Sequence, residues 1–272
     1  MKHQSFKKLT TLSLFFLLVG SVMLTHAETP EEIMKKAHLV SYYQGKDGKS
    51  QMLMQVFSKS RKEPIKKLFT MIKYDVEEGG EQMFLVYFTQ PSDIQRTTFL
   101  VHKKINEDDY RRLYIPASDK ILAIAGSRKQ DPFMGSDFSY EDVSGRHYTK
   151  DNHKILDETT LDNVPVYHME STPKENEDKI AKIVSWIAKD TFIPMKVEFY
   201  GQDGKMFKYY KPGKIINIQG YPTVIQRLMI SPDEDTKTLI SLNPQQTAYD
   251  IGMSEEIFSE RSLKNPPMEF LK

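Results

Sequence analysis

The sequence predicts a mainly β (α+β) protein built on one large, curled antiparallel sheet of about eleven strands. Along most of the chain, short segments rich in β-branched and aromatic residues alternate apolar and polar positions, as QMLMQVFS does at residues 51–58. Short joints rich in glycine, aspartate and asparagine separate these segments, and such joints connect antiparallel neighbours. The pattern shows no long helical crossovers, which a parallel sheet would need.

The first 27 residues have the pattern of a secretory signal peptide. Three lysines precede an apolar run of about 16 residues, which is short for a membrane span. Small residues follow at positions 25–27, so we expect cleavage after Ala27. An uncleaved anchor is the alternative. Under the first interpretation, residues 28–272 form a single exported domain.

One helix is expected at the start of this domain, within residues 28–43. Thr29 stands at a capping position, Pro30 at the first helical position, and Glu32 at the position of a capping-box partner. The apolar residues that recur on one face are Ile33, Ala37 and Val40. This helix therefore packs against the sheet.

The predicted hairpin joints contain residues that tolerate the positive φ of tight turns. They are Gly79-Gly80, residues 117–119, Asp162-Asn163, Asp203-Gly204 and residues 233–235. A sheet this wide should curl, and its concave face then needs a cover. The first helix and residues 131–145 are the available covers, so incomplete filling is expected. The 14 methionines suit an adaptable apolar cavity, although they equally suit an ordinary core.

Composition and motif searches exclude several classes of protein. The absence of cysteine removes disulfides, a thiol nucleophile and thiolate metal ligands. Motifs for a serine nucleophile, a phosphate-binding loop, a dinucleotide fold or a zinc protease are missing, and the histidines are scattered. The net charge of +1 falls to about −2 without the three signal-peptide lysines, which disfavours nucleic-acid binding. We therefore expect no enzyme activity, no metal and no cofactor.

The segment DPFMGSDFSYEDV, residues 131–143, is a polar loop that carries large apolar side chains. Ser139 can cap one helical turn, with Asp142 as its reciprocal partner and Gly145 as the C-terminal stop. The apolar side chains need a dry environment, and the mouth of the concave face provides one. They are Phe133, Met134, Phe138 and Tyr140.

Two stretches carry a resemblance to a known family. They are YFTQPSDIQRTTFLVHKK at residues 87–104 and RRLYIPASDKILAIAGSRKQDPFMGSDFSYEDV at residues 111–143. In the second, YIP is followed by DPFM, in the order strand, turn, strand and lid. With the exported start and the capped first helix, the chain resembles the outer membrane lipoprotein-sorting proteins, the LolA-like periplasmic lipoprotein carriers.

The resemblance implies an incomplete β-barrel, capped by the N-terminal helix and short lid helices over an apolar cavity. It implies binding of the acyl chains of a lipid or lipoprotein and their transfer through the periplasm toward the outer membrane. An inner-membrane RND-type exporter is a candidate partner, and we expect a monomer. Arg96 is the nearest match to the arginine that latches the lid in the carrier.

On this basis the apolar side chains of residues 131–143 are expected to act as a lid, with a plain core plug as the alternative. Candidate wall residues are Leu85, Phe99, Ile124, Trp186, Phe199 and Met229. The inward face of each strand stays open at this point, because a shift of one residue inverts it; Trp186 equally suits a core strand. Two rival functions are a sensor or interaction module that binds a lipoprotein or regulatory protein, and an exported hydrolase with an unrecognised site.

Overall fold

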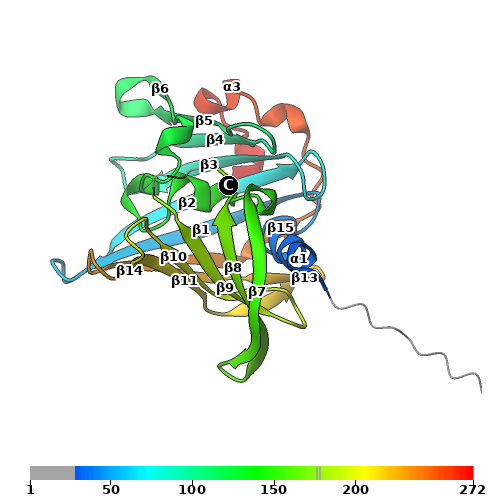
Figure 1. Cartoon of the computed structure of the whole chain (residues 1–272). Coiled ribbons are helices and arrows are strands. Elements are labelled where there is room, and N and C mark those ends of the chain that lie inside the picture. Colours follow the sequence, from blue (N-terminus) through cyan, green and yellow to red (C-terminus); the bar gives the residue numbers. More distant parts are fainter. Residues whose placement is uncertain (1–27, 176, 178, 272) are drawn as a thin grey trace, which may run out of the picture.

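The computed structural model describes residues 28–175, 177 and 179–271. The signal peptide expected at residues 1–27 lies outside the described residues. Thirteen antiparallel strands form one sheet in the order β6-β5-β4-β3-β2-β1-β15-β14-β11-β10-β9-β8-β7, and β12 and β13 form a separate pair (Figure 1). The result is a mainly β fold with a large antiparallel sheet and short helices, as the sequence predicted.

The strands are β1 (Asp47–Ser58), β2 (Ile65–Asp75), β3 (Gln82–Gln90), β4 (Thr98–Lys103), β5 (Tyr110–Ile115), β6 (Lys120–Ala123), β7 (Asp151–Leu161), β8 (Val164–Pro173), β9 (Lys182–Ala188), β10 (Pro194–Tyr200), β11 (Met206–Pro212), β12 (Ile215–Ile218), β13 (Tyr221–Val224), β14 (Gln226–Ser231) and β15 (Thr236–Tyr249). The α-helices are α1 (Pro30–Tyr42), α2 (Tyr140–Ser144), α3 (Arg261–Lys264) and α4 (Met268–Leu271). The 3₁₀ turns are η1 (Pro116–Ser118), η2 (Gly126–Arg128), η3 (Phe133–Gly135), η4 (Tyr148–Lys150) and η5 (Glu255–Ile257).

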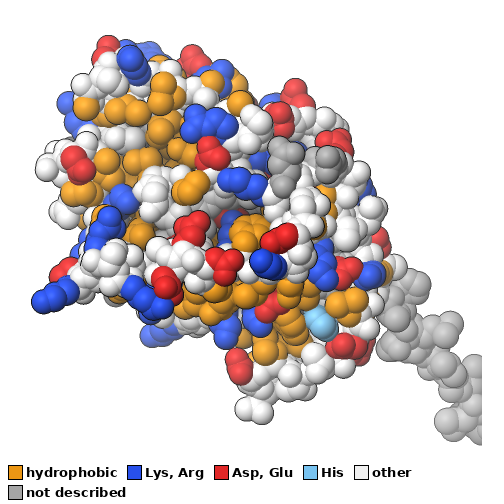
Figure 2. Space-filling view, turned by 60° about the vertical axis from the view of Figure 1, so that its left-hand side comes forward, with side chains coloured by type: hydrophobic (Ala, Val, Ile, Leu, Met, Phe, Trp, Pro, Cys, Tyr) orange, Lys and Arg blue, Asp and Glu red, His pale blue; other side chains and the backbone are white. Residues whose placement is uncertain are grey.

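The sheet is wider than the sequence suggested, and it is not closed. It has thirteen strands instead of about eleven, with β6 and β7 at its two edges. The sequence of β7 lacks the usual alternation because most of its side chains are exposed, so in the sequence only the joint after it marks this strand. The other edge keeps apolar side chains at the surface, since Ile121 and Leu122 of β6 are exposed. Figure 2 shows apolar side chains gathered in the upper part of one face of the molecule.

The hairpin joints lie where the sequence placed them. The five predicted joints separate β2 from β3, β5 from β6, β7 from β8, β10 from β11, and β14 from β15, and the strands of each pair are antiparallel neighbours. At the β7–β8 turn, Asp162 and Asn163 have φ values of 49° and 66°. These are residue types that tolerate the left-handed region, so local chemistry fixes the connections.

Alternate residues of the sheet enter two different cores. In β3, Phe84, Val86 and Phe88 join the cluster on the concave face, which also contains the apolar residues of β1, β14 and β15. Leu85 and Tyr87 point to the other face, where the C-terminal segment covers them. Figure 1 shows α3 beside β4 and β5. The C-terminal residues that complete this second cluster are Met253, Phe258, Leu263 and Leu271.

Helix α1 has the capping box expected from the sequence. The Glu32 amide donates to the Thr29 hydroxyl at 3.2 Å, and the Thr29 amide donates to the Glu32 carboxylate at 2.8 Å. Ile33 and Ala37 are buried against Met169 of β8 and Ile187 of β9. The helix therefore rests on the far half of the sheet, beside β15 and β13 in Figure 1. In the part of the chain that the structure describes, no helix has both the length and the apolar character of a membrane span.

The short helix predicted after residue 139 is α2, and its caps agree with the prediction. The Ser139 side chain accepts from the Asp142 amide at 3.1 Å, and the Asp142 carboxylate accepts from the Ser139 amide at 2.7 Å. Gly145 ends the helix with a φ of 79°. A Cβ at Gly145 would lie 2.6 Å from Cζ of Tyr42, so α1 and α2 approach closely at this glycine.

Candidate functional site: a cavity on the concave face

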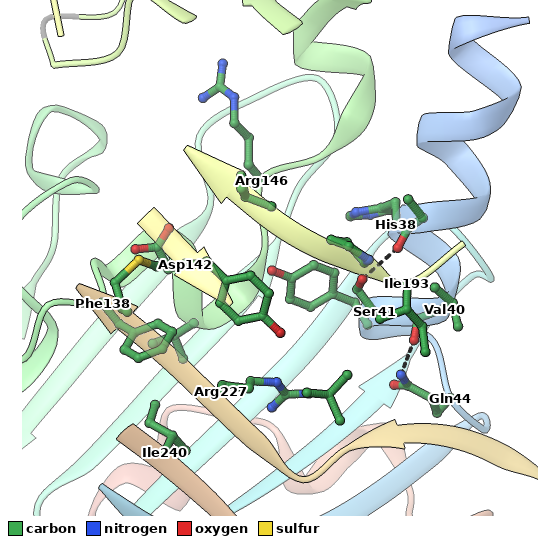
Figure 3. Close-up of a pocket in the computed structure, with 18 of the residues that line it drawn as sticks. His38, Val40, Ser41, Gln44, Phe138, Asp142, Arg146, Ile193, Arg227 and Ile240 are labelled. Atoms are coloured by element: carbon green, nitrogen blue, oxygen red, sulfur yellow. Dashed lines mark hydrogen bonds between the residues drawn. The ribbon is translucent and has the colours of Figure 1, made fainter. Parts of the chain in front are cut away.

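A cavity of about 290 Å³ lies on the concave face of the sheet, between α1 and the segment of residues 131–143. We call this segment the lid segment. The cavity wall comes from β1, β2, β3, β9, β10, β11, β14 and β15 (Figure 3). Its surface is mainly apolar because the inward-facing positions of these strands carry aliphatic, methionine and phenylalanine side chains. Examples are Met52, Phe69, Phe84, Ile183, Ile240 and Leu242.

The lid segment fills the other part of the concave face. The Phe133 ring packs 5.3 Å from the Phe99 ring, 6.0 Å from the Phe88 ring and 5.5 Å from the Tyr140 ring, measured between centroids. Phe133 and Phe138 also line the cavity. The two phenylalanines therefore form the boundary between a packed half and a hollow half of the same face.

Polar contacts attach the lid segment to the sheet. Lys67 Nζ of β2 donates to the Met134 carbonyl at 2.8 Å, and Met134 itself has a φ of 51°. The Asp137 carboxylate accepts from the hydroxyls of Thr236 and Thr238 on β15. Further along, Lys208 of β11 pairs with Asp142 of α2. The segment thus bridges strands on both sides of β1 and β15.

At the rim of the cavity, Arg146 forms an ion-pair network just after α2. Its guanidinium lies 2.8 Å from Asp151, 3.0 Å from Glu177 and 3.3 Å from Glu141. Burial opposes its charge, but the three carboxylates more than offset burial and raise the pKa of Arg146. Glu141 belongs to α2 and Asp151 to β7, so the network joins the lid segment to the edge of the sheet.

A buried basic cluster lies where α1, β4 and α2 meet. Lys103 Nζ lies 3.3 Å from Nε2 of His38 and 3.3 Å from the Ser144 carbonyl. Burial lowers the pKa of Lys103 to about 7, although Asp109 and Glu141 oppose the shift. Burial, followed by the charge of Lys103, lowers the pKa of His38 below its ordinary value. Burial therefore disfavours the positive charge of this cluster, and Lys103 changes its protonation near neutral pH.

Four of the ten lid and wall residues chosen from the sequence line the cavity: Phe133, Phe138, Phe199 and Met229. Four others belong to the same concave-face cluster, in the half that the lid segment fills: Phe99, Ile124, Met134 and Tyr140. The structure therefore brings eight of the ten residues to one face. Their binding of a ligand remains a prediction.

The remaining two wall candidates, Leu85 and Trp186, point away from the cavity. Leu85 is buried in the cluster beneath the C-terminal helices. The Trp186 ring stacks on His168 with centroids 4.7 Å apart, and Lys196 Nζ lies over the Trp186 ring, 4.7 Å from its centroid. The neighbours Ser185 and Ile187 line the cavity. Both positions are one residue out of register with the inward face, which the sequence pattern alone does not determine.

Arg96, the latch candidate, is exposed in the turn between β3 and β4 and has a φ of 66°. Its amide donates to the Phe88 carbonyl at 2.8 Å. Other basic side chains contact the lid segment. Lys67, Lys208 and Arg146 reach it from outside, and Arg128, Lys129 and Lys179 pair with its residues Asp131 and Glu141.

The cavity also contains polar residues that were not chosen from the sequence, among them Tyr42 of α1, Tyr210 of β11 and Arg227 of β14. In the sequence, Tyr209 and Tyr210 fall on opposite faces of one strand, so at most one of them can face the cavity. The antiparallel pairing places the two strand residues opposite apolar wall residues, because Tyr210 pairs with Met229 and Arg227 with Ile240. Within the described residues, no group of three or more His, Asp or Glu side chains could hold a metal ion.

The model of a family described as "Uncharacterized protein" matches residues 80–265. The chain belongs to this family. The match spans strands β3 to β15 completely and includes the whole lid segment. No curated protein matched the sequence.

Solved structures have the same architecture. A DUF1329 family protein from Desulfovibrio piger superposes with a TM-score of 0.79 at 25% identity, covering 86% of this chain and 97% of that chain. An outer membrane lipoprotein-sorting protein domain from Vibrio parahaemolyticus gives a TM-score of 0.79 at 26% identity, with 86% and 98% covered. A LolA superfamily protein from Nitrosomonas europaea gives 0.68 at 15% identity, with 86% and 99% covered, which shows the fold alone. The resemblance seen in the sequence is thereby confirmed.

Proposed function

We propose that this protein is an exported, periplasmic carrier that binds acyl chains of a lipid or lipoprotein and moves them toward the outer membrane. The observation that carries the proposal is the apolar cavity between a curled sheet and the lid segment. The similarity to a lipoprotein-sorting protein domain supports it. The proposal includes cleavage of residues 1–27 and a single ligand-binding domain in residues 28–272. It assigns the protein to binding rather than catalysis.

The energetics of such a ligand are favourable without specific polar chemistry. Each methylene group that leaves water contributes about 0.8 kcal/mol, so eight buried methylenes contribute about 6 kcal/mol. Transfer also requires release, and the lid segment is the element we expect to move. It is attached by a few polar contacts, at Met134, Asp137 and Asp142, that a partner could exchange. On the family resemblance alone, an inner-membrane RND-type exporter is our candidate for that partner.

Extraction of bound material from the mature protein tests the proposal. The protein is purified from the periplasm without detergent, and its organic extract is analysed by mass spectrometry. We expect lipid or acylated peptide in near-stoichiometric amount. A protein that carries no acyl compound and takes up none from lipid vesicles would contradict the proposal.

A pair of variants adds a structural control. Phe199→Asp places a carboxylate in the cavity wall, while Phe207→Asp makes the same change on a half-buried phenylalanine whose ring centroid is 6.4 Å away and which lies outside the cavity. A charge in a dry wall opposes burial of an acyl chain, so we expect Phe199→Asp to lose the bound material and Phe207→Asp to keep it. Equal retention by the two variants would place the ligand elsewhere. Circular dichroism of both variants confirms that the sheet is folded.

A further inference from the structure

We infer that Arg227, together with Tyr42 and Tyr210, forms an anion-binding site inside the cavity, and that the ligand is an acyl chain carrying one negatively charged group. The inference rests on the proposed function, because it names the chemical class of the ligand. It concerns the polar end of that ligand, whereas the apolar wall receives the chain.

The strand pairing places these groups on one surface. Arg227 lies opposite Pro212 of β11 and Ile240 of β15, and Tyr210 lies two residues before Pro212, on the same face. The Arg227 guanidinium lies near enough to the Tyr210 hydroxyl to oppose, by charge and hydrogen bonding, the rise in the Tyr210 pKa that burial causes. Tyr42, the last residue of α1, is close enough for the charge of Arg227 to act on its pKa. Figure 3 shows Arg227 among the side chains that line the cavity, below Asp142 and Phe138.

Arg227 lacks a carboxylate partner, unlike the other cations whose side chains face the cavity. Lys73 is 2.9 Å from Asp75, and Arg146 is 2.8 Å from Asp151. Among residues 28–175, 177 and 179–271, no carboxylate lies within ion-pair distance of the Arg227 guanidinium. A half-buried arginine in an apolar cavity is therefore left with unused donors.

The other charged residues at the cavity do not compensate Arg227. Asp142 is already paired with Lys208. Lys49 borders the cavity, but its cross-strand partner Ile72 belongs to the cluster on the opposite face, so its side chain points away. With His38 held neutral by burial, the uncompensated charge inside the cavity is positive.

The two tyrosines supply further donors. Burial raises the pKa of both Tyr42 and Tyr210, so both hydroxyls stay protonated. In the described part of the chain, neither hydroxyl donates a hydrogen bond to a protein acceptor. A planar guanidinium flanked by hydroxyl donors suits a carboxylate or a phosphate, which accept several charge-assisted hydrogen bonds at once.

This arrangement discriminates between ligand classes. The ester, amide and thioether linkages that attach acyl chains to a lipoprotein carry no charge near neutral pH, so they leave the Arg227 charge uncompensated. A fatty acid or a phosphate-bearing lipid would neutralise it. The chemistry common to both is an acyl or alkyl chain that ends in an anionic oxygen group.

Three probes with the same chain length test the inference by isothermal titration: dodecanoate, dodecyl phosphate and the neutral methyl dodecanoate. We expect delipidated wild-type protein to bind at least one anion about tenfold to a hundredfold more tightly than the ester. Tighter binding of dodecanoate points to a fatty acid, and tighter binding of dodecyl phosphate to a phosphate-bearing lipid. Equal binding of all three probes would overturn the inference and leave the proposed function intact. If the protein binds none of the three probes, the proposed function itself is contradicted.

Variants assign the preference to Arg227. Arg227→Gln should abolish the preference for the anion while changing binding of the ester less than about threefold, and Arg227→Lys, which keeps the charge, should retain part of it. Arg61→Gln is the matched control, since Arg61 is exposed and does not line the cavity. A preference that survives Arg227→Gln would also overturn the assignment. The wild-type comparison of probes stands even if one variant does not fold.

Discussion

Replacing Lys103 with methionine should make the stability of this protein less dependent on pH above neutrality. Lys103 is 1% exposed, and burial lowers its pKa from 10.5 to about 7 in the folded state. In the unfolded chain its pKa is near 10.5, so between pH 7 and pH 10.5 the unfolded state binds a proton that the folded state does not. Wild-type stability therefore gains from a rise in pH, and the Lys103→Met variant loses this contribution.

The size of the effect follows from the pKa difference. One pKa unit corresponds to about 1.4 kcal/mol of free energy of unfolding. Because Lys103 is only partly protonated in the folded state at pH 7, its contribution to the free energy of unfolding rises by about 2 kcal/mol between pH 7 and pH 9. The variant should have its largest advantage at or below pH 7, where wild-type Lys103 must carry its charge in a buried site. His38 and His147 have pKa values lowered by burial, so in the folded protein they are neutral over this range. Burial, the largest cause of both shifts, is unchanged in the variant, so both imidazoles stay neutral in either protein over this range.

Urea denaturation at pH 7, 8 and 9, followed by circular dichroism, measures the effect. The quantity of interest is the free energy of unfolding of wild type minus that of Lys103→Met, which should rise with pH. Lys211→Met is the control, because it makes the same substitution at an exposed lysine of the sheet. If the free energy of unfolding of wild type minus that of Lys103→Met stays constant within about 0.5 kcal/mol from pH 7 to pH 9, Lys103 keeps an ordinary pKa and the reasoning is refuted.

Two other predictions concern the lid segment and its C-terminal stop. Gly145→Ala should destabilise the protein by about 1–3 kcal/mol, because φ is 79° and the added Cβ would lie 2.6 Å from Tyr42. Gly204→Ala is the control: φ is 76° there and nothing lies within 4 Å, so this variant measures the cost of the backbone conformation alone. Similar melting temperatures for the two variants would show that the contact with Tyr42 does not destabilise the Gly145 variant. Asp137→Ala should leave the Thr238 hydroxyl without its carboxylate acceptor and weaken attachment of residues 131–143 by about 1.5–3 kcal/mol, seen as faster amide hydrogen exchange in that segment alone. Unchanged exchange there would mean that Asp137 does not hold the segment.

Local chemistry determined the parts of the fold that the sequence predicted well. The capping boxes at Thr29 and Ser139 need only residues three positions apart, and the joints between hairpin strands need only residues that tolerate positive φ. The lid segment was found in a similar way, since large apolar side chains in a polar loop need a dry environment. The residues that give each of these signals lie within a few positions of one another, so the signals can be recognised without knowing which strands pair.

The parts that the sequence did not predict depend on contacts between distant strands. Leu85 and Trp186 lie in segments that are apolar on both faces, so alternation does not distinguish the inward from the outward side. The cavity position of Arg227 follows from its pairing with Pro212 and Ile240, and the sequence contains no local sign of that pairing. Strand β7 is an exposed edge and carries too few apolar residues to be recognised.

The wall of the cavity is a continuous antiparallel ladder, and this has a consequence for how selective the protein can be. The amide and carbonyl groups along β1, β2, β14 and β15 are paired with neighbouring strands, so the main chain of this wall offers a guest few free hydrogen-bonding groups. Once the charged end of a guest is held at Arg227, the rest of its chain meets side chains only, and chains of different length fit the same hollow. Substitution of single side chains can therefore retune selectivity while leaving the scaffold unchanged.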